Sequence, residues 1–109
     1  MSTKIIENFE AMLTQGKDSP MLRFGLGQGY LQAGAPDKAI EHLSAAIGQK
    51  RDYSAAWKLL AKAYEQQGKL TEALQTYRDG IEVAQNHGDL QAAKEMTVFA
   101  CRIEKQLAG

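Results

Sequence analysis

The sequence has little of what usually signals a disulfide, a cofactor or a membrane. Its 109 residues include one cysteine, Cys101, so no disulfide can form within the chain, and no Cys/His cluster has metal-site spacing. No apolar run approaches the roughly 18–20 residues of a membrane span. Acidic residues interrupt the apolar ones in residues 1–10, unlike the continuous apolar segment of a signal peptide. We therefore expect a soluble, cytoplasmic protein with no cofactor, no metal and no membrane insertion.

An excess of charge of one sign is also absent. Lys plus Arg number 13 and Asp plus Glu number 13, so the formal net charge is +0 at pH 7. The densest basic stretch is Lys50–Arg51, and Asp52 follows it at once. Proteins that bind nucleic acid or an anionic membrane carry a basic excess or a basic stripe. We therefore expect no nucleic acid partner.

What the sequence does contain is an internal repeat. Hydrophobic residues make up 44% of the chain, enough for the core of a single domain over residues 1–109. A shift of 34 residues places identical residues opposite one another. These pairs are Leu26 and Leu60, Tyr30 and Tyr64, Gly34 and Gly68, Ala39 and Ala73, and Ile47 and Ile81. The pairing defines two consecutive units, repeat 1 at 20–53 and repeat 2 at 54–87.

The apolar spacing within each unit is that of an α-helix. Trp57, Leu60 and Tyr64 lie at i, i+3 and i+7, which places them on one side of a helix, and no segment alternates with the period of a strand. Gly34 and Gly68 lie where a left-handed residue ends the first helix of each unit. Small residues recur where helix axes must approach closely: Gly27, Ala39, Ala46, Ala61, Ala73 and Gly80. The expected fold class is all-α.

The two repeats are flanked by further amphipathic segments. Residues 3–16 match the second helix of a repeat in the 34-residue register, and Ser19 with Pro20 forms an N-cap before the next helix. Residues 89–108 keep one apolar stripe but lose the repeat motif, as a terminal cap requires. We therefore expect about six helices: an N-terminal half-repeat helix at 3–16, two hairpins at 20–53 and 54–87, and a capping helix at 89–108.

The repeat resembles a known family. The tetratricopeptide repeat pattern W-x2-L-G-x2-Y…A-x3-F…A is similar to Trp57-x2-Leu60-Ala61-x2-Tyr64 followed by Gly68, Ala73, Tyr77 and Gly80. The first unit resembles it as well, with Arg23 in the tryptophan position. The family's proline near the repeat end is replaced by Arg51 and Gln85. The resemblance implies a right-handed superhelical stack of antiparallel helix hairpins whose first helices line a concave groove.

The resemblance also assigns residues to this groove. By the family's groove positions they are Met21, Phe24, Gln28, Leu31, Gln32, Lys58, Lys62, Glu65 and Gln66, together with Ala55. Met21, Phe24 and Leu31 form an apolar patch, and Lys58 and Lys62 form a basic pair. Such a surface suits an extended or helical peptide with an apolar anchor and an acidic group. In the opposing interpretation, Met21 and Phe24 pack under the N-terminal helix and both lysines are ordinary solvated surface.

The other residues that could carry chemistry are isolated. His42 lies off the apolar stripe of its helix and His87 adjoins a helix end, so we expect neither a metal ligand nor a base. Cys101 lacks an activating neighbour and is expected to be a partly buried structural thiol. The glycines at 25, 27 and 29 lie inside a predicted helix and not in a phosphate-binding loop. Each lowers helix propensity by about 1 kcal/mol relative to Ala, so this helix should be the softest of the array.

These observations favour a non-enzymatic interaction protein. The leading hypothesis is a module that binds a peptide or helix of a partner protein in its groove and acts as an adaptor or assembly factor. Capture of a C-terminal carboxylate is not expected, because Leu59 stands where some family members have asparagine. The alternative is a self-associating repeat protein, a homodimer formed through the flanking helices with no groove ligand. No nucleophile–base pair supports an enzyme.

Overall fold

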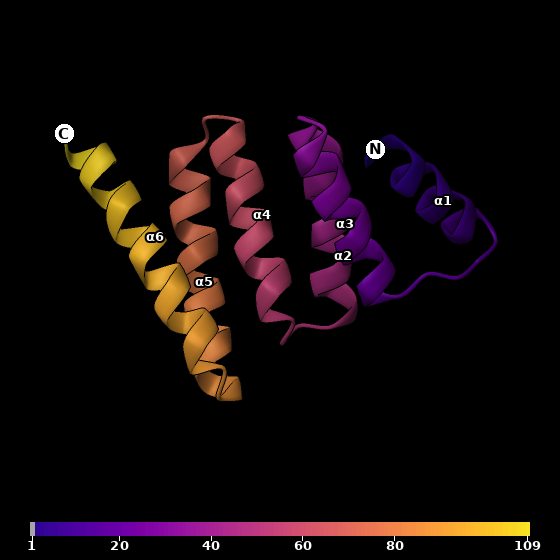
Figure 1. Ribbon diagram of the computed structural model, residues 1–109. Helices are drawn as coiled ribbons and strands as arrows, with labels where there is room; N and C mark the ends of the chain where they lie inside the picture. Colours follow the sequence, from indigo (N-terminus) through magenta and orange to yellow (C-terminus); the bar gives the residue numbers. More distant parts are fainter. Residues whose placement is uncertain (1) are drawn as a thin grey trace.

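The chain folds into six helices over residues 2–109, the part that the computed structural model describes (Figure 1). The helices are α1 (Ser2–Thr14), α2 (Pro20–Gln32), α3 (Pro36–Gln49), α4 (Ser54–Gln66), α5 (Leu70–His87) and α6 (Leu90–Ala108). α2 packs on α3 and α4 on α5, each as an antiparallel hairpin, and α6 packs on α5. The expected all-α fold of about six helices in antiparallel pairs is confirmed.

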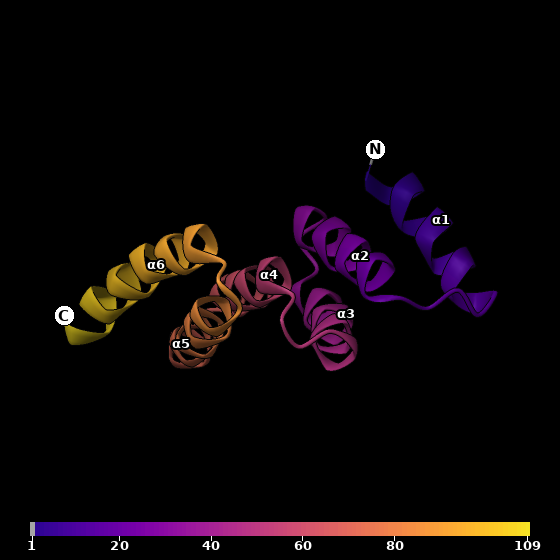
Figure 2. The ribbon, with the colours of Figure 1, turned by 90° about the horizontal axis from the view of Figure 1, so that it is seen from below.

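The helices form two layers. Figure 2 shows α2, α4 and α6 along one side of the array and α3 and α5 along the other. Contacts of α3 with α4 join the two repeats, while α1 packs on α2 at the N-terminal end. We call the surface formed by α2, α4 and α6 the groove face, because it contains the first helix of each hairpin.

The helix ends follow the signals in the sequence. The Ser19 Oγ accepts the backbone N–H of Leu22 at 3.1 Å, and Pro20 begins α2, where its missing N–H has no partner to lose. Gly34 and Gly68 have φ angles of 76° and 77°, the left-handed conformation expected after the first helix of each hairpin. A residue with a Cβ would be strained at either position. These glycines therefore set where α2 and α4 stop.

Close helix contacts depend on small residues in the core. Gly27 lies against the side chain of Leu43, which is fully buried. Gly80 lies between Trp57 and Met96, and a Cβ built on it would be 2.8 Å from the Trp57 Cβ and 2.8 Å from the Met96 Sδ. Neither distance is tolerated between real atoms without a shift, so Gly80 allows α5 to approach both α4 and α6.

The N-terminal helix uses glycine in the same way. A Cβ on Gly25 would lie 2.5 Å from the Phe9 ring, and one on Gly29 would lie 2.9 Å from Ile6. α1 therefore rests its apolar side chains directly on the α2 backbone. This contact explains why α2 keeps glycines that lower its helix propensity.

Candidate functional site

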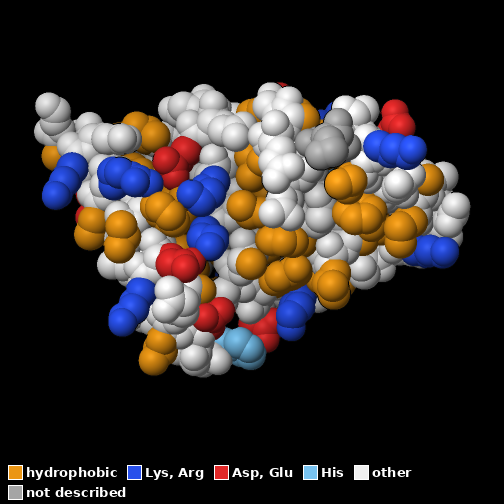
Figure 3. Space-filling view, in the orientation of Figure 1, with side chains coloured by type: hydrophobic (Ala, Val, Ile, Leu, Met, Phe, Trp, Pro, Cys, Tyr) orange, Lys and Arg blue, Asp and Glu red, His pale blue; other side chains and the backbone are white. Residues whose placement is uncertain are grey.

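The groove face carries an apolar region and a basic region. Figure 3 views this face and shows hydrophobic side chains gathered from α4 across to α2 and α1, with Lys and Arg side chains over α4 and α6. The side chains that the sequence assigned to the groove fall into these two regions.

In the apolar region, the three predicted residues have different surroundings. Met21 is 77% exposed, so it does not pack under α1. Phe24 is half-buried and stacks on Tyr53, with ring centroids 5.1 Å apart. Leu31 is only 9% exposed and belongs to the core, so it offers little surface to a partner. Met21 and the Phe24–Tyr53 stack are thus the available apolar elements.

A hollow of about 300 Å³ lies between α1 and α2. It is lined by Ile5, Phe9, Gly25, Gln28, Gly29 and Gln32. Gln28 and Gln32 are exposed, as expected for groove residues, and Ile5 is 50% exposed. The hollow therefore combines apolar walls with two amide groups.

The two predicted lysines differ in their surroundings. Lys58 donates to the Glu95 carboxylate of α6 at 2.8 Å, and this contact lowers the pKa of Glu95. Lys62 instead lies over the Phe99 ring, its Nζ 3.9 Å from the ring centroid. Burial lowers the pKa of Lys62. The basic pair therefore consists of one lysine held by a carboxylate and one held by an aromatic face.

The remaining predicted residues of α4 hold the fold together. The Glu65 carboxylate accepts the Tyr77 hydroxyl at 2.6 Å, and the pKa of Tyr77 is raised by burial and by this bond. Gln66 donates its side-chain N–H to the Leu31 carbonyl at 3.3 Å, which links α4 to α2. Both side chains are engaged before any partner arrives.

Sequence reasoning missed the contribution of α6 to this face. Phe99 lies against Lys62, and the Arg102 guanidinium lies 5.0 Å from the centroid of the same ring. The repeat motif is lost in this segment, so nothing marked α6 as more than a cap. Extending the 34-residue register would have placed Phe99 on the groove position of Glu65.

A cluster of polar side chains joins α1 to the first hairpin. The Tyr30 hydroxyl donates to Glu10 at 2.5 Å, which raises the pKa of Tyr30 to about 12, and its ring stacks on His42 at 5.6 Å. The Arg23 Nη1 lies 3.1 Å from the His42 Nδ1. Because arginine can only donate, Nδ1 accepts, and the His42 proton sits on Nε2, 3.5 Å from Glu10. His42 is therefore a neutral structural residue, and burial lowers its pKa.

Two expectations about isolated residues are wrong. His42, expected off the apolar stripe, is 4% exposed because Tyr30 and Arg23 cover it. Cys101, expected to be partly buried, is exposed, because it lies on the solvent side of α6.

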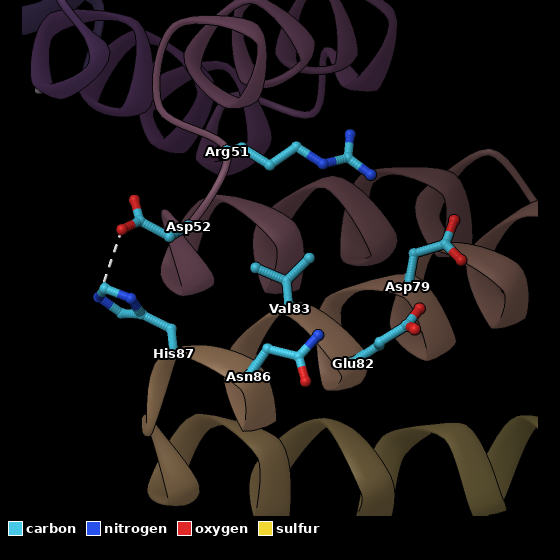
Figure 4. A pocket seen from close by; sticks show the side chains of 7 residues that line it. All are labelled: Arg51, Asp52, Asp79, Glu82, Val83, Asn86 and His87. Carbon is cyan, nitrogen blue, oxygen red and sulfur yellow. Dashed lines mark ion pairs between the residues drawn. The ribbon is translucent and has the colours of Figure 1, made fainter.

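A further hollow lies away from the groove face, between α5 and the α3–α4 connection (Figure 4). Its volume is about 650 Å³, and its lining consists of Arg51, Asp52, Asp79, Glu82, Val83, Asn86 and His87. Asp52 pairs with Lys50 at 3.0 Å and lies 3.3 Å from the His87 Nε2. Within residues 2–109, no three His, Cys, Asp or Glu side chains are grouped so that they could hold a metal ion. This hollow is an open, acidic surface feature.

The paired antiparallel helices and the two-layer array define the class of helical-repeat proteins built from helix hairpins. The tetratricopeptide repeat pattern matches residues 30–96, more than half of the chain. The chain belongs to the tetratricopeptide repeat family. Proteins of this family are typically non-catalytic and generally mediate protein–protein interactions.

Individual relatives agree with this assignment. The chain is 48% identical over 101 residues to the TPR repeat-containing protein PA0015 of Pseudomonas aeruginosa, covering 93% of this chain and 96% of the relative. It is 42% identical to protein BPP2914 of Bordetella parapertussis, whose solution structure superimposes with a TM-score of 0.84 over 94% of this chain and 89% of that one. The first TPR of Spaghetti (RPAP3), bound to the HSP90 peptide SRMEEVD, shares the fold at 21% identity, with a TM-score of 0.73 over 99% and 94% of the chains.

The described helices also bear on membrane insertion. None of them, within residues 2–109, combines the length and the apolar character that a membrane crossing requires.

Proposed function

We propose that this chain binds a peptide or helix of a partner protein on its groove face and acts as an adaptor or assembly factor. The observation that carries the proposal is the 77% exposure of Met21, which lies three residues before Phe24 on α2 and so on the same side of the helix as the Phe24–Tyr53 stack. A large flexible apolar side chain left open next to aromatic rings is typical of a binding surface, because its burial by a partner is favourable.

The rest of the groove face is better suited to a segment of a protein than to a small-molecule ligand. The hollow lined by Gln28 and Gln32 lies along α2, and the basic region lies on the next helices of the same face, α4 and α6. An extended chain or a single helix can reach both regions at once. The Spaghetti TPR domain, which shares this fold, holds a peptide.

Site-specific photo-cross-linking in living cells tests this function. A photo-reactive amino acid would replace Met21 or Gln28 on the groove face, and Glu41 or Gln75 on α3 and α5 as matched exposed controls. We expect discrete cross-linked partners from the first two positions and none from the controls. Equal labelling from both faces, or labelling from the controls alone, would contradict the proposal.

A second candidate, self-association, has one specific observation in its favour. Leu90 and Val98 on α6 are 64% and 62% exposed, and both line a hollow of about 510 Å³. In the repeat register Leu90 matches Ala56, which is buried. α6 therefore presents a face that a further helix, such as α6 of a second copy, would cover.

Sedimentation equilibrium separates the second candidate from the first. A dimer through α6 predicts concentration-dependent association that is abolished by Val98→Asp. A chain that stays monomeric at concentrations well above those in a cell would eliminate it and leave the groove proposal intact.

A further inference from the structure

We infer that the groove face recognises an acidic side chain of its partner through Lys62 and Arg102, which flank the Phe99 ring. This inference rests on the proposed function and specifies the chemistry of the bound segment. It assigns a binding role to Arg102 and Phe99, which lie in the helix that the sequence marks only as a cap.

The first support is geometric. The Lys62 Nζ is 3.9 Å from the Phe99 centroid and the Arg102 guanidinium carbon is 5.0 Å from it. Phe99 in turn packs against Tyr77, with ring centroids 5.7 Å apart, and Tyr77 is fully buried. The ring is therefore fixed by the core, and it holds two cations from different helices, Lys62 of α4 and Arg102 of α6, against itself.

The second support is the charge balance. Among the residues that the structure describes, neither Lys62 nor Arg102 has a carboxylate oxygen within 4.0 Å. The charges of Glu65 and Glu95 act on Lys62 from beyond that distance, and both carboxylates accept hydrogen bonds from other groups, Glu65 from Tyr77 and Glu95 from Lys58. Two cations held against one ring, neither of them in an ion pair, favour the approach of an anion from a partner.

The occupant that fits is an Asp or Glu side chain of a protein segment. A planar guanidinium and an ammonium can both donate to one carboxylate, and such charge-assisted bonds are stronger than neutral ones. The apolar elements at Met21 and Phe24 lie on the same face, so an acidic residue here would lie some distance along the segment from an apolar anchor.

Lys58 does not share this role, although the sequence grouped it with Lys62. Its ammonium is neutralised by Glu95 at 2.8 Å. Gln91 also donates to Glu95, at 3.3 Å. A partner carboxylate at Lys58 would have to displace Glu95, whereas Lys62 and Arg102 form no ion pair among the residues that the structure describes.

Selection from a random-peptide phage library against the full chain provides the probe. We expect the selected peptides to carry Asp or Glu at a recurring position. The affinity of one selected peptide should fall about tenfold in a Lys62→Gln/Arg102→Gln variant, as expected for loss of charge-assisted hydrogen bonds. The matched control is Lys69→Gln/Lys94→Gln, which removes the same charge from exposed positions off this site and should leave the affinity unchanged.

Two further controls complete the experiment. Lys62→Arg should retain the affinity, which separates loss of charge from loss of fold. A copy of the peptide with Asn and Gln in place of its acids should bind the wild type and the Lys62→Gln/Arg102→Gln variant equally weakly.

The outcomes distinguish this inference from the function on which it rests. Selected peptides that bind the groove face without acidic enrichment, with equal affinity for both double variants, would overturn the acidic inference and leave the proposed function standing. Failure to select any peptide, or peptides that do not compete with cross-linking at Gln28, would overturn both.

Discussion

At the scale of single residues, the glycines of this chain do two different things. Gly80 lies in a contact where a Cβ would be 2.8 Å from Trp57 and from Met96, whereas a Cβ on Gly48 of α3 would meet nothing within 4 Å. The same substitution therefore has opposite consequences at the two sites. At Gly80, the overpacking caused by a new methyl group outweighs the gain in helix propensity. At Gly48, the gain in helix propensity acts alone.

We predict that Gly80→Ala destabilises the chain by up to about 2 kcal/mol, since overpacking costs about 1–3 kcal/mol and the gain in helix propensity is only about 1 kcal/mol. Gly48→Ala, the matched control, should be neutral or stabilising by up to about 1 kcal/mol. Urea unfolding followed by circular dichroism measures both. A stabilised Gly80→Ala protein would show that α4, α5 and α6 are packed less tightly than described.

His42 makes the stability of the fold depend on pH. The His42 Nδ1 accepts from Arg23, so protonation of Nδ1 would set its new N–H against the N–H of the Arg23 guanidinium. The nearby charges of Glu10 and Glu41 only partly offset the cost of burying the imidazolium charge. Burial holds the folded-state pKa of His42 below its ordinary value of 6.5. The unfolded chain therefore binds more protons than the folded one just below that pH, and stability falls as the pH falls.

We predict that wild-type stability declines between about pH 7.5 and about pH 5.5, and that His42→Gln removes most of this decline. Glutamine keeps one acceptor for Arg23 and one donor for Glu10 without titrating. Urea midpoints at the two pH values are the measurement. If wild type and variant show the same pH dependence, the buried neutral His42 is not its source.

At the scale of elements, α2 combines close packing against α1 with a low helix propensity of its own. α2 contains glycines at 25, 27 and 29, and two of them receive Phe9 and Ile6 of α1. The close contact stabilises α1, but each glycine lowers the helix propensity of α2. The local stability of α2 therefore depends on α1 remaining docked.

We predict that α2 exchanges its amide hydrogens faster than α3, α4 and α5, because its glycines make local opening easier. Hydrogen exchange followed by NMR resolves the individual helices. Finding α2 to be the most protected helix would contradict this prediction.

Prediction from sequence succeeded where one residue sets local structure and failed where several elements meet. The 34-residue period, Gly34 and Gly68 were enough for the fold and the helix ends, because spacing and left-handed turns are local properties. His42 is buried by Tyr30 and Arg23 of the neighbouring helix α2, and Cys101 lies on the exposed side of α6, and both outcomes depend on how the helices pack. The pairing of Lys62 with Phe99 joins α4 to α6 and lay outside the recognisable motif.

At the scale of the whole molecule, the chain is a short array with one continuous face made by α2, α4 and α6 (Figure 2). Its two hairpins are closed by α1 at one end and by α6 at the other, and α6 also contributes Phe99 and Arg102 to the groove face. An array of this length offers room for one short segment or one helix, which favours a single specific contact over a broad scaffold.

The central claim, that the groove face is the binding surface, is tested most directly by NMR titration of the isotope-labelled chain with a peptide selected against it. The account predicts that shifted amide signals cluster on α2, α4 and α6, including those of Met21, Gln28 and Lys62. Shifts confined to α3 and α5, or to the outer side of α6 around Leu90 and Val98, would contradict it.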